Sequence, residues 1–492
     1  MIEPSLRTAL LSLACITPAL AAEGGVDLIL HNGKIATLAT DESFVEAIAI
    51  DQGVVHSVGA DDLVLALRDA GTRVVDLDGR TVIPGLNDSH IHVVRGGRFY
   101  NLELRWDGVP NLTEGLARVS EQARRTPKGQ WVRVIGGWSP FQFAERRMPT
   151  IAELNAAAPE TPVFVLFLYS MGFLNRAGVA ALGLTPETPA PEGSRYEFVD
   201  GGAALIADPN PMILYRTIAA LPQLTEEQQV NSTLQFYREL SRFGVTSAVD
   251  AGGGGHEFPT GYVATERLAA EGGLPLRISF FLFPQHPGEE LQDFRRWTSD
   301  HEAGENRDVL HDGGYVLEGG GEFLVWSAGD YENFLSPRPE IGHGAASDLE
   351  AVTRHLVENR WPFRIHATYG ESIDRLLDVF AKVDRELPFD GLRWAIDHAE
   401  TIRPDQIQRV QRLGGGIAVQ DRMAFAGEYF LQRYGPDVAA EAPPLRRLVD
   451  SGVPLGAGTD ATSVSCHYPW ISLSWMVSGK TVGGTQLVPP SK

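Results

Sequence analysis

Short apolar runs that end at turn residues fill the N-terminal part of the chain, from Val26 to Val82. Runs rich in β-branched residues and bounded by glycine, asparagine or aspartate predict strands, which we expect at 28–33, 46–53, 54–59 and 73–79. Asn32-Gly33 and Gln52-Gly53 are typical of hairpin turns. We therefore expect a small antiparallel domain of the β-sandwich type over residues 22–84.

After Pro84-Gly85 the pattern changes to apolar runs that alternate with amphipathic helices. Strand-like runs stand at 163–168, 245–250, 363–366, 394–398, 416–420 and 453–458, and helix-like segments at 225–243, 347–359, 373–387 and 403–413. Strands that alternate with helices predict a parallel sheet, and this many units predict closure into a (β/α)8 (TIM) barrel over residues 85–492. In such a barrel the chemistry lies at the carboxyl ends of the strands.

Composition and charge narrow the class of protein. Apolar residues make up 43% of the chain and charged residues 21%, as in an ordinary globular protein. The formal net charge is −21, and no basic run with interleaved aromatic residues is present. Such a chain repels dense phosphate, so we expect a small-molecule substrate and no nucleic-acid partner. A homo-oligomer is compatible with the sequence.

The first residues predict an export signal. Arg7 precedes an apolar stretch over 8–21, which ends in the small-residue cleavage pattern Ala19-Leu20-Ala21. Because this stretch is too short to span ~30 Å of hydrocarbon, we expect cleavage after Ala21, no membrane span, and a periplasmic or secreted protein. Cleavage removes Cys15, the alternative lipoprotein site, and leaves Cys466 as the only cysteine, so no internal disulfide is expected.

Five residues of metal-binding type stand where predicted strands end. They are His90, His92, His366, His398 and Asp460. Residues two apart in a strand face the same side, so His90 and His92 can bind one ion together. A single histidine is weak evidence, but this set at strand ends, in barrel order, predicts a metal site. Imidazole and carboxylate suit Zn²⁺, Fe²⁺ or Mn²⁺, with zinc the default.

The motifs around these residues resemble a known family. Residues 82–92 (Val-Ile-Pro-Gly-Leu-Asn-Asp-Ser-His-Ile-His), with Asp397-His398-Ala399-Glu400 and Gly458-Thr459-Asp460-Ala461, are similar to the amidohydrolase superfamily. The closer likeness is to amidohydrolase family 3, which includes N-substituted formamide deformylase and exoenzyme-regulation-like proteins. The resemblance implies a metal-dependent hydrolase that cleaves an amide, another C–N bond or an ester of a small organic molecule.

The resemblance also implies roles for the ligands. His90 and His92 would hold the more buried of two ions, and His366 and His398 the more exposed one. Asp460 would bind metal and act as the catalytic proton shuttle. A bound metal lowers the pKa of water to about 7 and polarises the scissile carbonyl. The number of ions, one or two, stays open.

Three departures from the family pattern affect these expectations. Where relatives carry a metal-bridging lysine, this chain has Glu318-Gly-Gly-Gly-Glu322, and we expect Glu318 to supply the bridging carboxylate with Glu322 behind the ligands. Ser170 stands where relatives often carry a histidine, which indicates a changed substrate. The chain ends at Lys492, shortly after Asp460, where relatives continue. On this comparison we expect truncation after the eighth strand and an incomplete small domain.

Two other function classes remain open at the level of sequence. The same barrel supports a non-hydrolytic metal-dependent lyase, isomerase or decarboxylase, because a fold does not fix the chemistry. The departures at Glu318 and Ser170 also allow a binding or regulatory relative with a decayed site. The intact histidine and aspartate set favours the hydrolase.

Overall fold

The computed structural model describes residues 25–39, 44–254, 256–304, 313–330, 334–335, 341–342 and 344–489. The predicted export signal, residues 1–21, lies outside the described residues. The chain divides into two compact units at Pro84 and Gly85. Within the described ranges, no helix has both the length and the apolar character needed to cross a membrane.

The smaller unit contains two short sheets. Their strand orders are β5-β4-β1-β6 and β3-β2-β7. The elements are β1 (Leu28–His31), β2 (Lys34–Ala36), β3 (Phe44–Val45), β4 (Ala47–Asp51), β5 (Val54–Gly59), α1 (Asp61–Leu65), β6 (Arg73–Asp76) and β7 (Thr81–Val82). Ile29, Ala47, Ala49 and Val64 form its buried core.

The expectation of a wholly antiparallel unit is wrong in two places. β1 pairs with β6, and β2 with β7, in parallel. Gln52-Gly53 does form a two-residue hairpin between β4 and β5, with φ of 49° and 76°. Asn32-Gly33 instead connects β1 to β2 in the other sheet, because a turn dipeptide reverses the chain without fixing which strand pairs next.

The larger unit is built on a barrel of eight parallel strands, which confirms the predicted α/β (β/α)8 class. In sheet order the strands are β8 (Leu86–Ile91), β15 (Val245–Asp250), β16 (Arg277–Leu282), β17 (Tyr315–Gly320), β18 (Phe363–Ala367), β19 (Trp394–His398), β20 (Gly416–Gln420) and β21 (Leu455–Gly458). Backbone hydrogen bonds from Asp460 to His90 (2.8 Å) and from His92 to Ala461 (2.9 Å) join the two terminal strand ends. They bring the first and last predicted ligands side by side.

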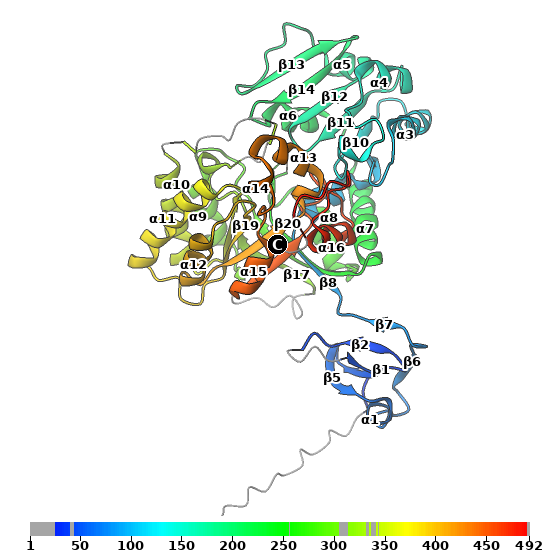
Figure 1. The fold of residues 1–492 in the computed structure, drawn as a ribbon, viewed down its shortest axis with the longest axis vertical. Helices are drawn as coiled ribbons and strands as arrows, with labels where there is room; N and C mark the ends of the chain where they lie inside the picture. The colour runs from blue at the N-terminus through cyan, green and yellow to red at the C-terminus, as the bar shows by residue number, and fades with distance from the viewer. Residues whose placement is uncertain are drawn as a thin grey trace, which may run out of the picture. The chain divides into compact units, whose positions relative to one another are not determined.

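Helices follow the barrel strands, and Figure 1 shows many of them around its outside. They are α2 (Val93–Phe99), α7 (Glu226–Arg242), α8 (Val263–Ala270), α9 (Glu290–Asp300), α10 (Ala345–Glu358), α11 (Gly370–Glu386), α12 (Pro404–Arg412), α13 (Arg422–Tyr434), α14 (Pro436–Ala439), α15 (Leu445–Ser451) and α16 (Pro469–Ser478). In α11 the buried residues Ile373, Leu376, Leu377 and Phe380 recur at helical spacing and form one apolar face. This face packs against the strands.

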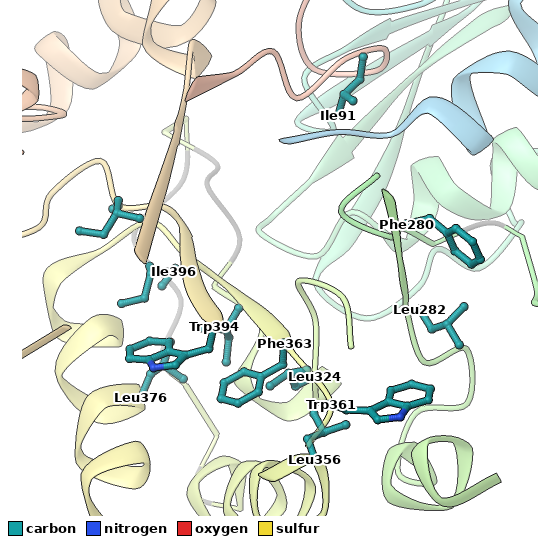
Figure 2. Packing of buried hydrophobic residues seen from close by; sticks show 14 of the residues in the cluster. Ile91, Phe280, Leu282, Leu324, Leu356, Trp361, Phe363, Leu376, Trp394 and Ile396 are labelled. Atoms are coloured by element: carbon teal, nitrogen blue, oxygen red, sulfur yellow. The ribbon is translucent and has the colours of Figure 1, made fainter. Parts of the chain in front are cut away.

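Aromatic packing fixes the two strands that carry His366 and His398. Phe363 of β18 and Trp394 of β19 stack with ring centroids 6.1 Å apart, and Phe380 of α11 lies 5.1 Å from Trp394. Figure 2 shows Phe363 and Trp394 within the buried cluster. Because α11 packs tightly against these two strands, the histidines at their carboxyl ends are held in place.

A second sheet is inserted between the first two barrel strands. Its order is β13-β14-β12-β11-β10-β9. Its strands are β9 (Glu103–Leu104), β10 (Val132–Val134), β11 (Val163–Phe167), β12 (Met171–Leu174), β13 (Ser194–Val199) and β14 (Gly202–Ala207), with helices α3 (Leu112–Arg125), α4 (Ile151–Ala157), α5 (Arg176–Leu182) and α6 (Met212–Ala220). The run at 163–168, expected among the barrel strands, lies here as β11. Every residue of β11 is buried, so its pattern could not tell a strand of the parallel barrel from a central strand of this mixed sheet.

Candidate metal centre

The barrel brings six buried side chains together at the carboxyl ends of its strands. They are His90 and His92 at the end of β8, Glu322 after β17, His366 in β18, His398 in β19 and Asp460 after β21. All five histidine and aspartate positions expected from the sequence are in this group. Glu322, which the sequence placed behind the ligands, is among them.

The first histidine pair is oriented from behind. His90 Nδ1 lies 3.3 Å from Oδ1 of Asp397, and His92 Nδ1 donates to the backbone carbonyl of Gly252. Arg364 holds Asp397 in turn, with its Nε 2.7 Å from Oδ2. A ring nitrogen anchored in this way fixes the tautomer and directs Nε2 of each ring toward the site.

Asp460 faces this pair. Its Oδ1 lies 3.1 Å from Nε2 of His92 and 3.5 Å from Nε2 of His90, and its Oδ2 accepts a hydrogen bond from Arg422 at 3.0 Å. Burial raises the pKa of Asp460, but the adjacent rings of His90 and His92 and the charge of Arg422 hold this pKa well below its usual range. Asp460 has a φ of 54°, a strained conformation for a residue with a side chain, and such strain is typical of functional sites.

The carboxylate of Glu322 lies between the two histidine pairs. Its Oε1 is 3.5 Å from Nε2 of His92, and its Oε2 is 3.6 Å from Nε2 of His90. The same Oε2 lies 3.2 Å from Nδ1 of His366 and 3.6 Å from Nε2 of His398. Backbone hydrogen bonds to Ala251 (3.0 Å) and from His366 (2.8 Å) fix the position of this residue. Glu322 therefore has the bridging geometry that was expected of Glu318.

The structure corrects the assignment of Glu318. This residue lies within β17, where its carboxylate pairs with Arg393 at 2.5 Å. It lines a cavity with Ser89 and Pro454, near the amino ends of the strands. Among the described residues the carboxylate of Glu318 forms an ion pair with Arg393 and with none of the four histidines. Glu322 directly follows the strand, and that position was the sequence signal that could have identified it.

The second histidine pair completes the group. The rings of His366 and His398 have centroids 4.0 Å apart. Nε2 of His366 lies 2.8 Å from the backbone oxygen of Asp330, which leaves Nδ1 to face Glu322. Nδ1 of His398 lies 3.5 Å from Oε1 of the buried Glu400. Its other ring nitrogen, Nε2, therefore faces the carboxylate of Glu322. Each pair thus has a ring nitrogen directed at Glu322.

These residues fit a divalent metal. Two overlapping sets, His90, His92 and Asp460, and His90, Glu322 and His398, each have donor atoms within 4.8 Å of one another. Among the described residues His90 Nε2 has no hydrogen-bond partner although it is buried, and buried polar atoms are normally satisfied. Burial lowers the pKa of His90, but Asp397 and Glu322 raise it to about 10. The surrounding carboxylates therefore favour a cation at this point.

A pocket opens from the metal-binding residues toward the inserted sheet. Its lining includes His92, Glu322, His366, His398 and Asp460, and from the inserted segment Tyr169, Ser170 and Tyr215. Ser170, the position where a changed substrate contact was expected, therefore lies on the pocket wall. Phe283, Phe323 and Trp326 form an aromatic part of the same wall. The arrangement is that of a metalloenzyme with a small-molecule pocket.

Comparison with known proteins agrees with this class. The model of the amidohydrolase family matches residues 73–492. The chain is 26% identical to N-substituted formamide deformylase of Arthrobacter pascens, over 94% of this chain and 85% of that protein. It is 21% identical to the putative amidohydrolase YtcJ of Bacillus subtilis, over 88% of this chain and 80% of that protein. A crystal structure of an uncharacterised metal-dependent hydrolase of Pyrococcus horikoshii has the same fold, with a TM-score of 0.64 at 22% identity, over 94% of this chain and 87% of that one.

The chain belongs to the amidohydrolase family, as its motifs indicated, and has a candidate metal centre at the carboxyl ends of its barrel strands.

Removing a histidine ligand is expected to remove metal and activity together. His92→Ala takes away a ring whose Nε2 faces both Asp460 and Glu322, so the remaining donors leave the ion under-coordinated. We expect a loss of activity of ~10²-fold or more, and His90→Ala should behave alike. His56→Ala, at an exposed position of β5, is the matched control. Elemental analysis and rate measurement on the same preparations check this, and full metal content with full turnover in either variant would contradict the assignment.

Proposed function

We propose that this protein hydrolyses an amide or another C–N bond, or an ester, of a small organic substrate. The metal is a divalent ion, most simply zinc, held by His90, His92, Glu322, His366, His398 and Asp460. The observation that carries the proposal is the carboxylate of Glu322, which lies within 3.6 Å of ring nitrogens from both histidine pairs. A shared carboxylate between two nitrogen-donor pairs is suited to one or two ions.

The chemistry divides between the metal and the protein. A bound divalent ion supplies Lewis acidity, which lowers the pKa of water to about 7 and polarises a carbonyl. Asp460 is the proton carrier, since it is ionised and its Oδ1 faces the site. It accepts the proton of the attacking water and delivers it to the departing nitrogen or oxygen. Arg422 holds the other oxygen of Asp460 and so keeps the carboxylate aimed at the reacting atoms.

Similarity to N-substituted formamide deformylase supports cleavage of a C–N bond rather than another reaction. The pocket supports a compact organic substrate, because aromatic side chains line it next to the metal-binding side chains. The similarity to the deformylase favours the hydrolase over a lyase, an isomerase or a binding protein.

The test uses metal-loaded protein in water enriched in ¹⁸O. The protein is loaded with zinc, iron(II) or manganese(II) and screened against N-substituted formamides, N-acyl amines and esters. We expect an amine or alcohol together with an acid that carries ¹⁸O. Products rearranged without ¹⁸O would favour the non-hydrolytic chemistry. A protein that takes up none of the three metals and shows no turnover after incubation with them would contradict the proposal.

We also propose that the protein is exported, with cleavage after Ala21. Support comes from the positive residue, apolar stretch and small-residue site within residues 1–21. N-terminal sequencing of protein from its native cells should start at Ala22 in the periplasmic or secreted fraction. A chain that retains Met1 in the cytoplasm would refute export.

A further inference from the structure

Arg95 lies next to the metal-binding residues. Helix α2 starts directly after His92, and Asp250 accepts a hydrogen bond from the backbone of Val94 at 2.7 Å, which fixes the first turn of the helix. Arg95 follows in that turn and lines the pocket. A Cβ added to Gly253 would stand 3.1 Å from both Nη1 of Arg95 and Nδ1 of His92. The guanidinium therefore borders the ring of a metal-binding histidine.

Among the described residues no carboxylate lies within ion-pair distance of Arg95, and the carboxylates whose charges raise its pKa, Asp460 and Glu322, are themselves metal-binding residues. Its Nε is buried without a hydrogen bond, and its guanidinium lies over the ring of Tyr169, whose centroid is 5.8 Å from Cζ. Arg364 and Arg422, which lie on the other sides of the site, are paired with Asp397 and Asp460. A cation without a direct ion pair in a partly desolvated pocket is costly, and a bound anion relieves that cost.

The wall opposite Arg95 is a strained turn of the inserted sheet. Leu168 and Tyr169 have φ of 50° and 53°, and Ser170 donates a backbone hydrogen bond to Phe167 at 2.9 Å. This is the geometry of a tight hairpin turn that normally favours glycine or asparagine. Strain of this kind is retained where it positions a side chain for function. Here it presents Tyr169 to the pocket, with its ring 4.8 Å from that of Tyr215.

We propose that the substrate carries an anionic group of carboxylate size, which Arg95 binds beside Tyr169 while the scissile bond lies at the metal-binding residues. The planar guanidinium matches a carboxylate with two parallel hydrogen bonds. The aromatic residues Phe283, Phe323 and Trp326 suit an apolar body on the same molecule. This inference rests on the proposed function and narrows its substrate to carboxylate-bearing amides.

The test compares two probes that differ in charge alone. Racemic N-acetylphenylalanine carries a carboxylate, and racemic N-acetylphenylalaninamide carries a neutral amide in its place. Calorimetric binding to zinc-loaded wild-type protein should favour the acid by ~10-fold or more, as expected for a partly desolvated charge pair. Arg95→Gln should abolish this preference and Arg95→Lys should keep part of it. Arg216→Gln, an exposed arginine beside Tyr215, should retain it in full.

Each outcome separates this inference from the proposed function. Equal affinity for the two probes in the wild type, including no measurable binding of either, would overturn the anion site. So would an undiminished preference in Arg95→Gln. If the acid is preferred through Arg95 but no amine is ever released from any amide, the anion site stands and amide hydrolysis fails. Zinc content, measured on every preparation, shows whether a variant has damaged the metal-binding residues instead.

Discussion

Glu322→Gln is expected to lose most of its bound metal and at least ~10²-fold of its activity. Groups that only orient the ligands already change activity by up to ~10²-fold when they are mutated, and a direct ligand should have at least this effect. The carboxylate of Glu322 faces ring nitrogens of four histidines at 3.2 to 3.6 Å. Glutamine keeps the shape of the side chain but lacks its negative charge. It also replaces one of the two metal-binding oxygens with an amide nitrogen, which does not bind metal. Elemental analysis and kcat/KM on the same preparation measure the effect.

Glu318→Gln is the matched control, with the same chemical change four residues earlier. The ion pair that it removes joins side chains of Glu318 and Arg393 that are 17% and 58% exposed. Such pairs contribute ~1 kcal/mol or less to stability, so metal content and rate should stay near those of the wild type. The reverse pattern would restore the assignment made from the sequence: Glu322→Gln would keep its metal and activity, and Glu318→Gln would lose its metal.

Asp460→Asn is expected to keep much of its metal while its rate falls by ~10²-fold or more, the usual contribution of a positioned general acid or base. Asparagine preserves the shape and one metal-binding oxygen but cannot accept a proton. His90, His92 and Glu322 remain to hold the ion. Metal content, melting temperature and rate on one preparation give the answer together.

A purely structural carboxylate at this position would behave differently. Metal or folding would then be lost in proportion to activity. Asp437→Asn, an exposed aspartate of α14, controls for the loss of one negative charge. An unchanged rate with full metal occupancy would remove Asp460 from the mechanism.

His366 and His398 could be predicted because they stand at the ends of apolar, buried strand patterns. His90, His92 and Asp460 follow weaker strand patterns and were identified from their residue types and their order along the chain. In a parallel barrel all such ends meet on one face, so position along the chain translates directly into position in space. His90 and His92 needed only the two-residue period of a strand. No long-range information was required beyond the count of strands.

Glu318 and Glu322 could not be told apart by the same reasoning. Three glycines separate them, and glycine carries no side-chain pattern that would mark where the strand ends. A bulge adds to the difficulty, since Phe280 pairs with Leu317 and Phe281 with Gly319, which leaves Glu318 as the extra residue. Because a bulge shifts the alternation of faces, the period of two fails at this residue.

The inserted sheet and Arg95 depend on tertiary context. The fully buried run of β11 has the composition of a barrel strand, and only pairing with β10 and β12 places it elsewhere. A single arginine after a His-x-His motif has no periodic signature. Its importance becomes visible only when the turn at Tyr169 is brought opposite it by the fold.

Anomalous diffraction from crystals of zinc-loaded protein, collected on both sides of the zinc absorption edge, tests the central claim most directly. The account predicts an anomalous peak among Nε2 of His90, Nε2 of His92, Oδ1 of Asp460 and the carboxylate of Glu322. A second ion, if bound, lies between Glu322 and the rings of His366 and His398. Zinc-loaded crystals with no anomalous density among these six side chains, or with density beside Glu318 and Arg393 instead, would contradict it.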